Sequence, residues 1–301
     1  MWRRRDFLQS FAALALPVCV ADGEGREPTR RTISSSGEQL PVIGMGSWLT
    51  FDCADNAAAL AIRTEVLRQF FAFGGGLIDS SPMYGSSEQA LGYCFTQLDS
   101  PRPLFSATKV WTFGRGMGTR QMKKSARLWG VDSFDLMQVH NLLDVDTHLD
   151  TLREWKGSGR LRYLGVTTSH GRRHGELEKL MLTGALDFVQ FTYNMIDREA
   201  EQRLLPIARE RGISVIVNRP FRASRVFDRV RGATLPNWAR DFDCDNWAQF
   251  FLKFIVSHPA VTCAIPATSR PQHMVENMGT LVGRLPDSAM RKQMAALYAA
   301  L

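Results

Sequence analysis

The sequence predicts an α/β chain folded as a single (β/α)8 TIM barrel, a closed parallel sheet surrounded by helices. Short apolar runs alternate with segments whose apolar residues recur at three- and four-residue spacing, the pattern of strands alternating with amphipathic helices. Apolar strands separated by such helices indicate a parallel sheet covered on its outside. Eight units in 301 residues favour the closed barrel, and "GMGSW" in the first strand does not lead into the GxGxxG helix start of an open dinucleotide-binding sheet.

The predicted strands share an apolar run that ends in polar or turn-forming residues; they cover 41–48, 76–81, 103–110, 134–141, 162–169, 188–194, 214–220 and 261–268. Between them, helical periodicity predicts helices that include 56–73, 119–130, 147–159 and 199–212. Glycine closes several of these helices at the expected position. The barrel domain is therefore expected to occupy residues 31–301, beginning with a short N-terminal hairpin.

Residues 1–21 predict an export signal. Basic residues precede a short apolar run, 11–20, that ends at the small residue Ala21, and the run is too short to span a bilayer. The stretch Arg4-Arg5-Asp6-Phe7-Leu8 resembles the twin-arginine (Tat) export motif, which predicts an encounter with the Tat translocon and a periplasmic or exported protein. An ordinary secretory signal or a retained basic arm is the alternative. Residues 22–30, polar and glycine-rich, are expected to be a linker.

Composition narrows the class of ligand. A formal charge of +7, carried partly by the N-terminal segment and without a basic-aromatic cluster, favours a small anionic ligand over nucleic acid. The cysteines are scattered, with no CxxC pair and no histidine at metal-ligand spacing, so no metal site is expected. We expect no stable insertion in a membrane, and a monomer or weak homo-oligomer.

Polar residues end most of the predicted strands, and the C-terminal ends of barrel strands are where active sites lie. They are Asp79 with Tyr84, Lys109, His140 with Asn141, Thr167 with Thr168, Gln190, Asn218 with Arg219, and Thr268. A buried lysine beside a phenol favours the phenolate, which would bring Tyr84 into use as a proton donor near neutral pH. Asp79 would compensate the charge of Lys109, and His140 would donate a hydrogen bond to a substrate oxygen.

The stretches "GGGLIDSSPMYGSSE", "LFSATKV", "FDLMQVHN" and "VQFTYN" resemble the aldo-keto reductase family, in order and in spacing, over residues 31 to the C-terminus. The resemblance implies an NADPH-dependent carbonyl reductase, with NADH as the alternative cofactor. The family's Asp-Tyr-Lys-His tetrad falls on Asp79, Tyr84, Lys109 and His140. Tyr84 would protonate the carbonyl oxygen of a small aldehyde or ketone while the nicotinamide delivers hydride.

The same resemblance implies cofactor contacts, several of them altered. Gln190 would bind the nicotinamide carboxamide, with Thr167 and Thr168 in place of the common Ser-Asn pair. "NRPF" (Asn218, Arg219, Pro220, Phe221) stands where many members stack a tyrosine, and Arg219 with Arg222 would clamp the pyrophosphate. In the final phosphate loop, Arg270 with Thr268 would hold a 2′-phosphate, His273 replaces an arginine, and Glu276 and Asn277 would lie near the adenine.

Four residues are expected in the substrate pocket: Trp48, Trp111, Phe113 and Asn141, although packing on the barrel rim explains Trp111 and Phe113 equally well. His148, His170, His174 and His258 are expected on the surface or at helix ends. Two alternatives to a reductase stay open. One is a catalytically weak nicotinamide-binding sensor or partner subunit, and the other is a barrel hydrolase that uses Asp79 and His140 with a metal.

Overall fold

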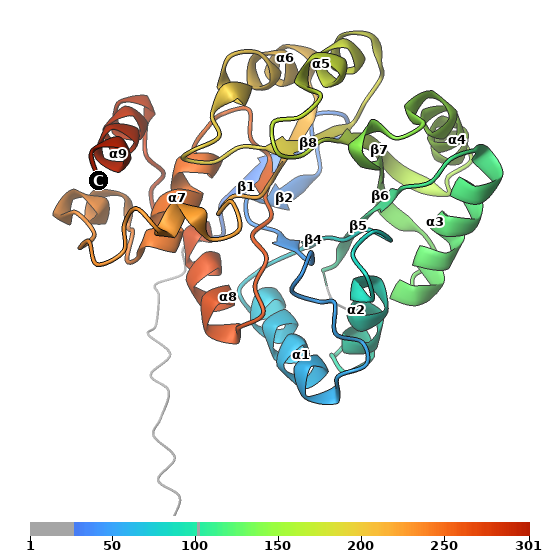
Figure 1. Ribbon diagram of the computed structural model, residues 1–301, viewed down its shortest axis with the longest axis horizontal. Helices are drawn as coiled ribbons and strands as arrows, with labels where there is room; N and C mark the ends of the chain where they lie inside the picture. Colours follow the sequence, from blue (N-terminus) through green and yellow to red (C-terminus); the bar gives the residue numbers. More distant parts are fainter. Residues whose placement is uncertain (1–26, 101–102) are drawn as a thin grey trace, which may run out of the picture.

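The computed structural model describes residues 27–100 and 103–301. The expected signal, 1–21, and the first part of the expected linker lie outside these residues. Eight parallel strands form one sheet in the order β10-β9-β8-β7-β6-β5-β4-β3, and a bridge between Ile43 and Ala264 joins its two ends. Figure 1 shows the resulting ring of strands from one end, with helices around it. The predicted barrel is confirmed.

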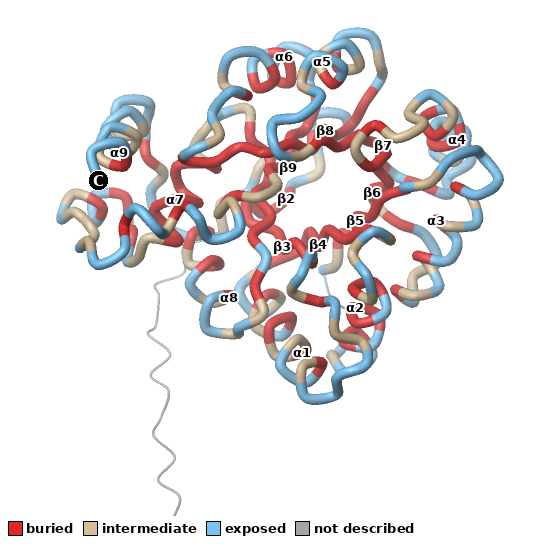
Figure 2. Tube along the Cα trace, in the orientation of Figure 1, coloured by how far each residue is buried: buried red, intermediate tan, exposed pale blue. Residues whose placement is uncertain are grey.

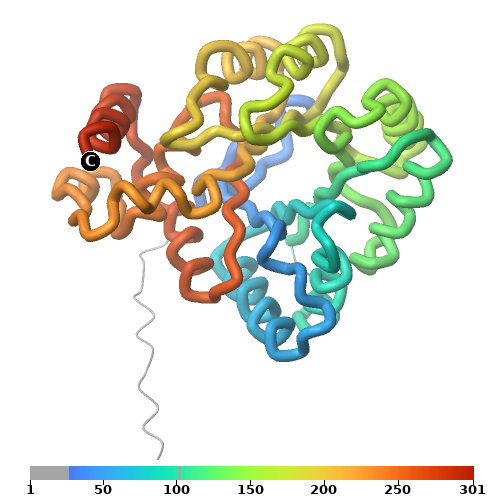
Figure 3. The backbone as a smooth tube through the Cα atoms, in the orientation of Figure 1, coloured from blue at the N-terminus to red at the C-terminus, as the bar shows by residue number. Residues whose placement is uncertain are grey.

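The barrel strands are β3 (Met45–Gly46), β4 (Leu77–Asp79), β5 (Phe105–Val110), β6 (Phe134–Val139), β7 (Leu161–Thr167), β8 (Phe188–Thr192), β9 (Ser214–Asn218) and β10 (Cys263–Ala264). Each lies within or next to a predicted run. The prediction 41–48 was too long, because Pro41 belongs to an antiparallel hairpin, β1 (Arg30–Thr32) with β2 (Gln39–Pro41), that pairs before the barrel begins. The expected N-terminal hairpin is thus present (Figure 3).

The outer helices are α1 (Ala57–Ala72), α2 (Ser87–Thr96), α3 (Arg115–Trp129), α4 (Val145–Gly157), α5 (His174–Thr183), α6 (Leu204–Arg211), α7 (Trp247–Val256), α8 (Pro271–Met278) and α9 (Ser288–Ala300). The predicted helix 199–212 is broken into a 3-10 turn, Glu199–Glu201, and α6. Pro206 explains the break, because proline lacks the N–H of a helix interior and fits only the first turn, where α6 places it. Among the described residues, no helix is long and apolar enough to cross a membrane.

Alternation along the strands separates an inner core from an outer one. Leu77, Phe105, Leu136, Phe188 and Ile216 face the barrel axis, where they pack with residues of the hairpin, while the residues between them pack against the helices. Figure 2 shows the strands as an almost continuous buried ring. Two residues further along β4, β6, β8 and β9, the same inner face becomes polar. This change of composition near the C-terminal ends of the strands positions the candidate site.

Candidate active site

The residues two positions beyond this inner apolar layer are Asp79 on β4, Gln138 on β6, Gln190 on β8 and Asn218 on β9. On β5, Lys109 lies two positions beyond the inward-facing Ala107. Because alternate residues of a strand face the same side, these side chains form a polar layer directly above the apolar one. The strand-end residues predicted from the sequence thereby meet at one end of the barrel.

A buried ion pair lies in this layer. The Lys109 ammonium donates to Asp79 Oδ2 at 2.5 Å and to the Ser80 carbonyl oxygen at 2.7 Å, and the lysine is completely buried. The side-chain amides of Gln138 and Gln190 both donate to Asp79 Oδ1 at 3.1 Å. Burial lowers the pKa of Lys109, but Asp79 and Tyr84 together outweigh it and the pKa is raised. Lys109 therefore stays charged, as a buried ammonium does only when it is well paired.

Tyr84 lies on the turn that follows β4, where its N–H donates to the Ser81 carbonyl at 2.9 Å. The turn is fixed from outside, because the backbone N–H and hydroxyl of Ser86 both donate to Asp52 at 2.8 Å. The Lys109 ammonium is 5.1 Å from the centre of the Tyr84 ring. Burial raises the pKa of the Tyr84 phenol, and Lys109 only partly opposes it. The expected lowering of this pKa is therefore wrong for the free protein, since desolvation of the phenolate exceeds the effect of one neighbouring cation.

His140 completes the cluster from the end of β6. Its ring lies edge-on to Tyr84, with 5.7 Å between ring centres, and its Nδ1 is 2.9 Å from the Ser81 hydroxyl. Burial, followed by the charge of Lys109, lowers the pKa of His140 to about 3. The ring is therefore neutral at physiological pH and carries one N–H. Ser81, which the sequence reading did not single out, orients this ring and so belongs to the site.

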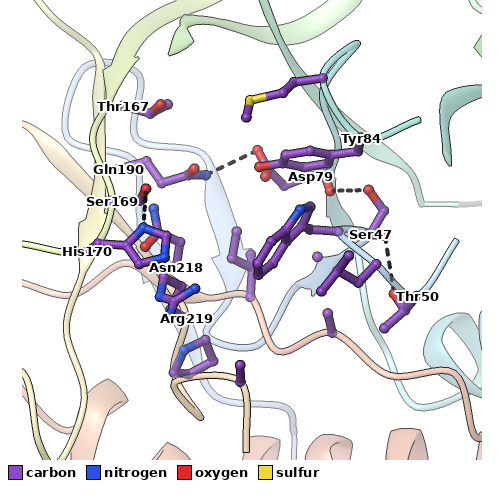
Figure 4. A pocket seen from close by; sticks show the side chains of 18 of the residues that line it. Ser47, Thr50, Asp79, Tyr84, Thr167, Ser169, His170, Gln190, Asn218 and Arg219 are labelled. Atoms are coloured by element: carbon purple, nitrogen blue, oxygen red, sulfur yellow. Dashed lines mark hydrogen bonds between the residues drawn. The ribbon is translucent and has the colours of Figure 1, made fainter. Parts of the chain in front are cut away.

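These groups border a cavity of about 390 Å³ (Figure 4). Of the predicted residues, the cavity is lined by Asp79, Tyr84, His140, Asn141, Thr167, Thr168, Gln190, Asn218, Arg219, Pro220, Phe221 and Trp48. Lys109 lies beneath it, behind Asp79. Unpredicted lining residues include Ser47, Met83, Ser169, His170, Ala223 and Ser224. Most of these come from loops, where the sequence shows no periodicity that would place a side chain.

Asn218, which stands where many members of the family stack a tyrosine, is held in the cavity wall between β7 and β9. Asn218 Nδ2 donates to the Thr168 carbonyl at 2.9 Å, and Thr192 donates to Asn218 Oδ1 at 2.7 Å, so the Asn218 amide is held between strands. The next residue, Arg219, has its guanidinium 5.8 Å from the centre of the Trp48 ring. Arg222 does not line the cavity and pairs with Asp197 at 3.3 Å.

The predicted walls Trp111 and Phe113 do not line the cavity. The backbone of Trp111 is tied outward at both its N–H and its carbonyl, by the side-chain amide of Gln121 on α3. Its ring centre is 6.5 Å from that of His140, which places it on the rim, and Phe113 is 70% exposed. For these two aromatic residues, the rim-packing alternative fits the structure better.

The residues expected around a 2′-phosphate and the adenine lie on the segment after β10, beside the cavity but outside its lining. They are Thr268, Arg270, His273, Glu276 and Asn277, of which the last four are in or next to α8. Ile265 and Ala267 of the same segment do line the cavity, so the two regions adjoin. Arg270 and His273 are exposed, whereas Asn277 is buried.

Of the four histidines expected on the surface or at helix ends, His148 is buried, and His170 is exposed as expected. His148 Nε2 lies 2.7 Å from the Thr112 carbonyl. His170 also borders the cavity, on the loop between β7 and α5 (Figure 4). Within residues 27–100 and 103–301, no group of three or more His, Cys, Asp or Glu side chains is arranged to hold a metal ion.

Comparison with known proteins identifies the type of molecule. The model of the Aldo/keto reductase family matches residues 42–297. The aldo-keto reductase YhdN of Bacillus subtilis is 23% identical over 201 residues, which cover 62% of this chain and 60% of that protein. The NADH-specific methylglyoxal reductase of Escherichia coli is 26% identical over 195 residues, covering 56% of this chain and 59% of that protein. The matched part thus spans about 60% of the length of these two curated relatives.

A solved structure of an aldo-keto reductase from Klebsiella pneumoniae in complex with NADPH superposes with a TM-score of 0.73. It is 22% identical in sequence, and the match covers 91% of this chain and 95% of that one. At this identity the likeness supports the fold. The family assignment depends on the match to the family model.

Proposed function

Because this chain is an oxidoreductase of the aldo/keto reductase family, we propose that it reduces small aldehydes or ketones to alcohols with NADPH or NADH, using Tyr84 as the proton donor. The observation that carries the proposal is the packing of Asp79, Tyr84, Lys109 and His140 around one end of the cavity. A carbonyl oxygen that becomes an alcohol must receive a proton, and Tyr84 and His140 are the proton-bearing side chains of this group that face the cavity.

Each member of the group has a distinct task in this proposal. His140 is neutral, and a Ser81 hydroxyl that donates to its Nδ1 leaves the N–H on Nε2, where it can donate to the substrate oxygen. Tyr84 gives up its proton as negative charge develops on that oxygen. Lys109 then stabilises the phenolate, and Asp79 holds Lys109 in place. The raised pKa of the Tyr84 phenol keeps its proton available at neutral pH.

The cavity also fits a nicotinamide nucleotide. Thr168 Oγ1 and Arg219 Nε are buried without a hydrogen-bond partner in the described part of the chain, and both residues line the cavity. Buried polar atoms without partners are rare, so they indicate a ligand with polar groups of its own. We propose that Thr167, Thr168 and Gln190 border the nicotinamide, that Arg219 holds phosphate, and that Arg270 with Thr268 reaches a 2′-phosphate. When bound, the reduced nicotinamide would supply the hydride.

Relatives leave the choice of cofactor open. The Klebsiella pneumoniae structure holds NADPH, whereas the Escherichia coli relative is NADH-specific. Arg222, the second arginine expected at the pyrophosphate, is already paired with Asp197. Arg219 is therefore the stronger candidate of the two, and an exchange of Arg270 for a neutral residue is the change that should separate NADPH from NADH binding.

The proposal is tested by a fluorescence titration with NADPH and NADH, followed by turnover of a panel of small carbonyl compounds. Tyr84→Phe is expected to lower kcat by about 10²- to 10⁴-fold, because proton donation contributes about that much, while nucleotide affinity stays close to that of the original protein. Tyr93→Phe, at an exposed tyrosine on α2, is the matched control and should change neither quantity.

Two outcomes would redirect the assignment. Tight nucleotide binding without turnover of any carbonyl compound would favour the sensor or partner subunit. Absence of nucleotide binding would contradict both the reductase and the sensor. Loss of turnover in Tyr93→Phe as well would mean that the Tyr84→Phe result reflects general damage to the fold.

We further propose that the protein acts outside the cytoplasm, after folding and loading with its cofactor. The support is the twin-arginine pattern at Arg4 and Arg5, which lies outside the described residues.

A further inference from the structure

A group of basic side chains borders one side of the cavity, at the ends of β7 and β9. His170 and Arg172 come from the loop after β7, and Arg219 and Arg222 from the loop after β9. His170 and Arg219 line the cavity and lie close together in Figure 4. Arg219 therefore brings a positive charge to the space in which a ligand would bind, with His170 beside it.

His170 is held in place by the end of β8 and by its own loop. Its N–H donates to Thr192 Oγ1 at 3.0 Å, and the same hydroxyl donates to Asn218 at the end of β9. Its ring Nδ1 is 2.9 Å from the Ser169 hydroxyl. Its Nε2 has no hydrogen-bond partner among the described residues. The imidazole thus stands at a fixed point of the cavity rim with one nitrogen available to a ligand.

The acidic residues around this group do not balance its charge. Asp197 is the carboxylate that acts on both His170 and Arg219, and it is already paired with Arg222 at 3.3 Å. Arg219 Nε is buried and has no hydrogen-bond partner within residues 27–100 and 103–301. Burial, then Arg219 and Arg172, hold the pKa of His170 below its ordinary value, with Arg222 adding to the effect and Asp197 opposing it. The positive charge that remains uncompensated here is what a binding site for an anion provides.

The backbone of the second loop adds donors of the right kind. Arg222, Ala223 and Ser224 have φ values of 47°, 51° and 70°, and Ala223 and Ser224 line the cavity. The N–H of Arg222 donates to the Arg219 carbonyl at 2.9 Å, whereas the N–H groups of Ala223 and Ser224 have no acceptor among the described residues. Open N–H groups in a turn can bind an anion. Side chains and backbone of this loop therefore favour the same class of ligand.

We propose that His170 and Arg219 together form a binding site for a phosphate-class anion, and that His170 takes up a proton when the anion binds. This rests on the proposed function, in which the anion is a phosphate of the nicotinamide nucleotide. An anion at this place offsets the charge of the arginines that, together with burial, lower the pKa of His170, so the protonated ring becomes the favoured partner. Linkage then requires nucleotide binding to tighten as the pH falls.

The test is calorimetric titration of the mature protein with NADH, which lacks a titrating 2′-phosphate, in pairs of buffers that differ in ionisation enthalpy. We expect uptake of up to one proton near pH about 6.5, and an affinity for NADH that rises about three- to tenfold between pH about 8 and about 6. His170→Asn should bind NADH without the uptake and without the pH dependence. His174→Gln, at a histidine that does not line the cavity, is the matched control and should behave like the original protein.

A second arm separates the anion site from the nucleotide. Sulfate carries two negative charges and does not titrate in this range, and it should raise the pKa of His170 in an NMR titration of the histidine rings. NADH binding with unchanged proton uptake in His170→Asn would overturn the proposal and leave the proposed function standing. Sulfate-dependent protonation without any nucleotide binding would support the anion site and contradict the proposed function.

Discussion

The pairing of Lys109 with Asp79 has a consequence for stability as well as for the proposed catalysis. Removing one partner leaves the other buried and unpaired, which costs more than losing both. We expect Lys109→Met to lower the free energy of unfolding by about 3–5 kcal/mol, and the double variant Asp79→Asn, Lys109→Met to recover part of that loss. Urea unfolding at neutral pH measures both. Equal destabilisation by the single and double variants would show that the charge of Asp79 is not left unpaired.

At this same scale, residue type and strand placement predicted that Asp79, Lys109 and His140 would meet, because each lies at the end of an apolar run, while Tyr84 lies in the turn that follows Asp79. Ser81 also ends a predicted strand, but the sequence does not show that its hydroxyl meets His140, 59 positions further on. Gln138 could not be found from the strand ends. Gln138 stands inside an apolar strand and gains its meaning from Asp79, a contact between residues 59 positions apart. The pKa of Tyr84 was wrongly expected to fall, because sequence shows the neighbouring cation and does not show how little water reaches the phenol.

Among the elements, α2 and α3 pack unusually closely at Gly92. A Cβ built there would lie 1.8 Å from the Leu128 carbonyl oxygen, whereas one at Gly157, at the end of α4, would meet no atom within 4 Å. Glycine to alanine normally favours a helix, by up to about 1 kcal/mol. We expect that gain at Gly157→Ala, and a loss of about 3 kcal/mol from overpacking at Gly92→Ala. Thermal unfolding of both variants checks the difference, and a Gly92→Ala protein as stable as Gly157→Ala would contradict this packing.

The strands and several of the helices were predictable because their periodicity is local. The residues at which these strands and helices begin and end were harder to predict. Pro41, predicted in the first barrel strand, pairs with β1 in the hairpin instead. A predicted helix is shorter than expected because of Pro206. The loops that carry Ser47, His170 and Ser224 into the cavity have no period to read, so the outline of the cofactor site depends on the folded structure.

For the whole molecule, the proposed export would carry its thiols into an oxidising compartment. Cys94, Cys244 and Cys263 are buried and Cys53 is partly buried, and all four are free thiols. Burial raises the pKa of each of them, to about 12 for Cys244, which suppresses the reactive thiolate.

We therefore expect protein from the exported fraction to retain these four thiols, with Cys53 alone of them reacting before unfolding. Thiol titration of native and unfolded protein measures this. A double substitution, Arg4→Lys with Arg5→Lys, should abolish appearance in that fraction. Export of this variant would contradict the twin-arginine route, and fewer free thiols in exported protein would reveal a disulfide.

The apolar layer below Asp79 closes the barrel interior at the end opposite the cavity. Ile33 and Leu40 of the hairpin pack into the same interior cluster as Leu77 and Phe105, so no passage runs through the axis. Any ligand must therefore reach the polar layer, and leave it, through the opening at the rim. When two molecules bind through a single opening, the one that lies deeper has to bind first and leave last.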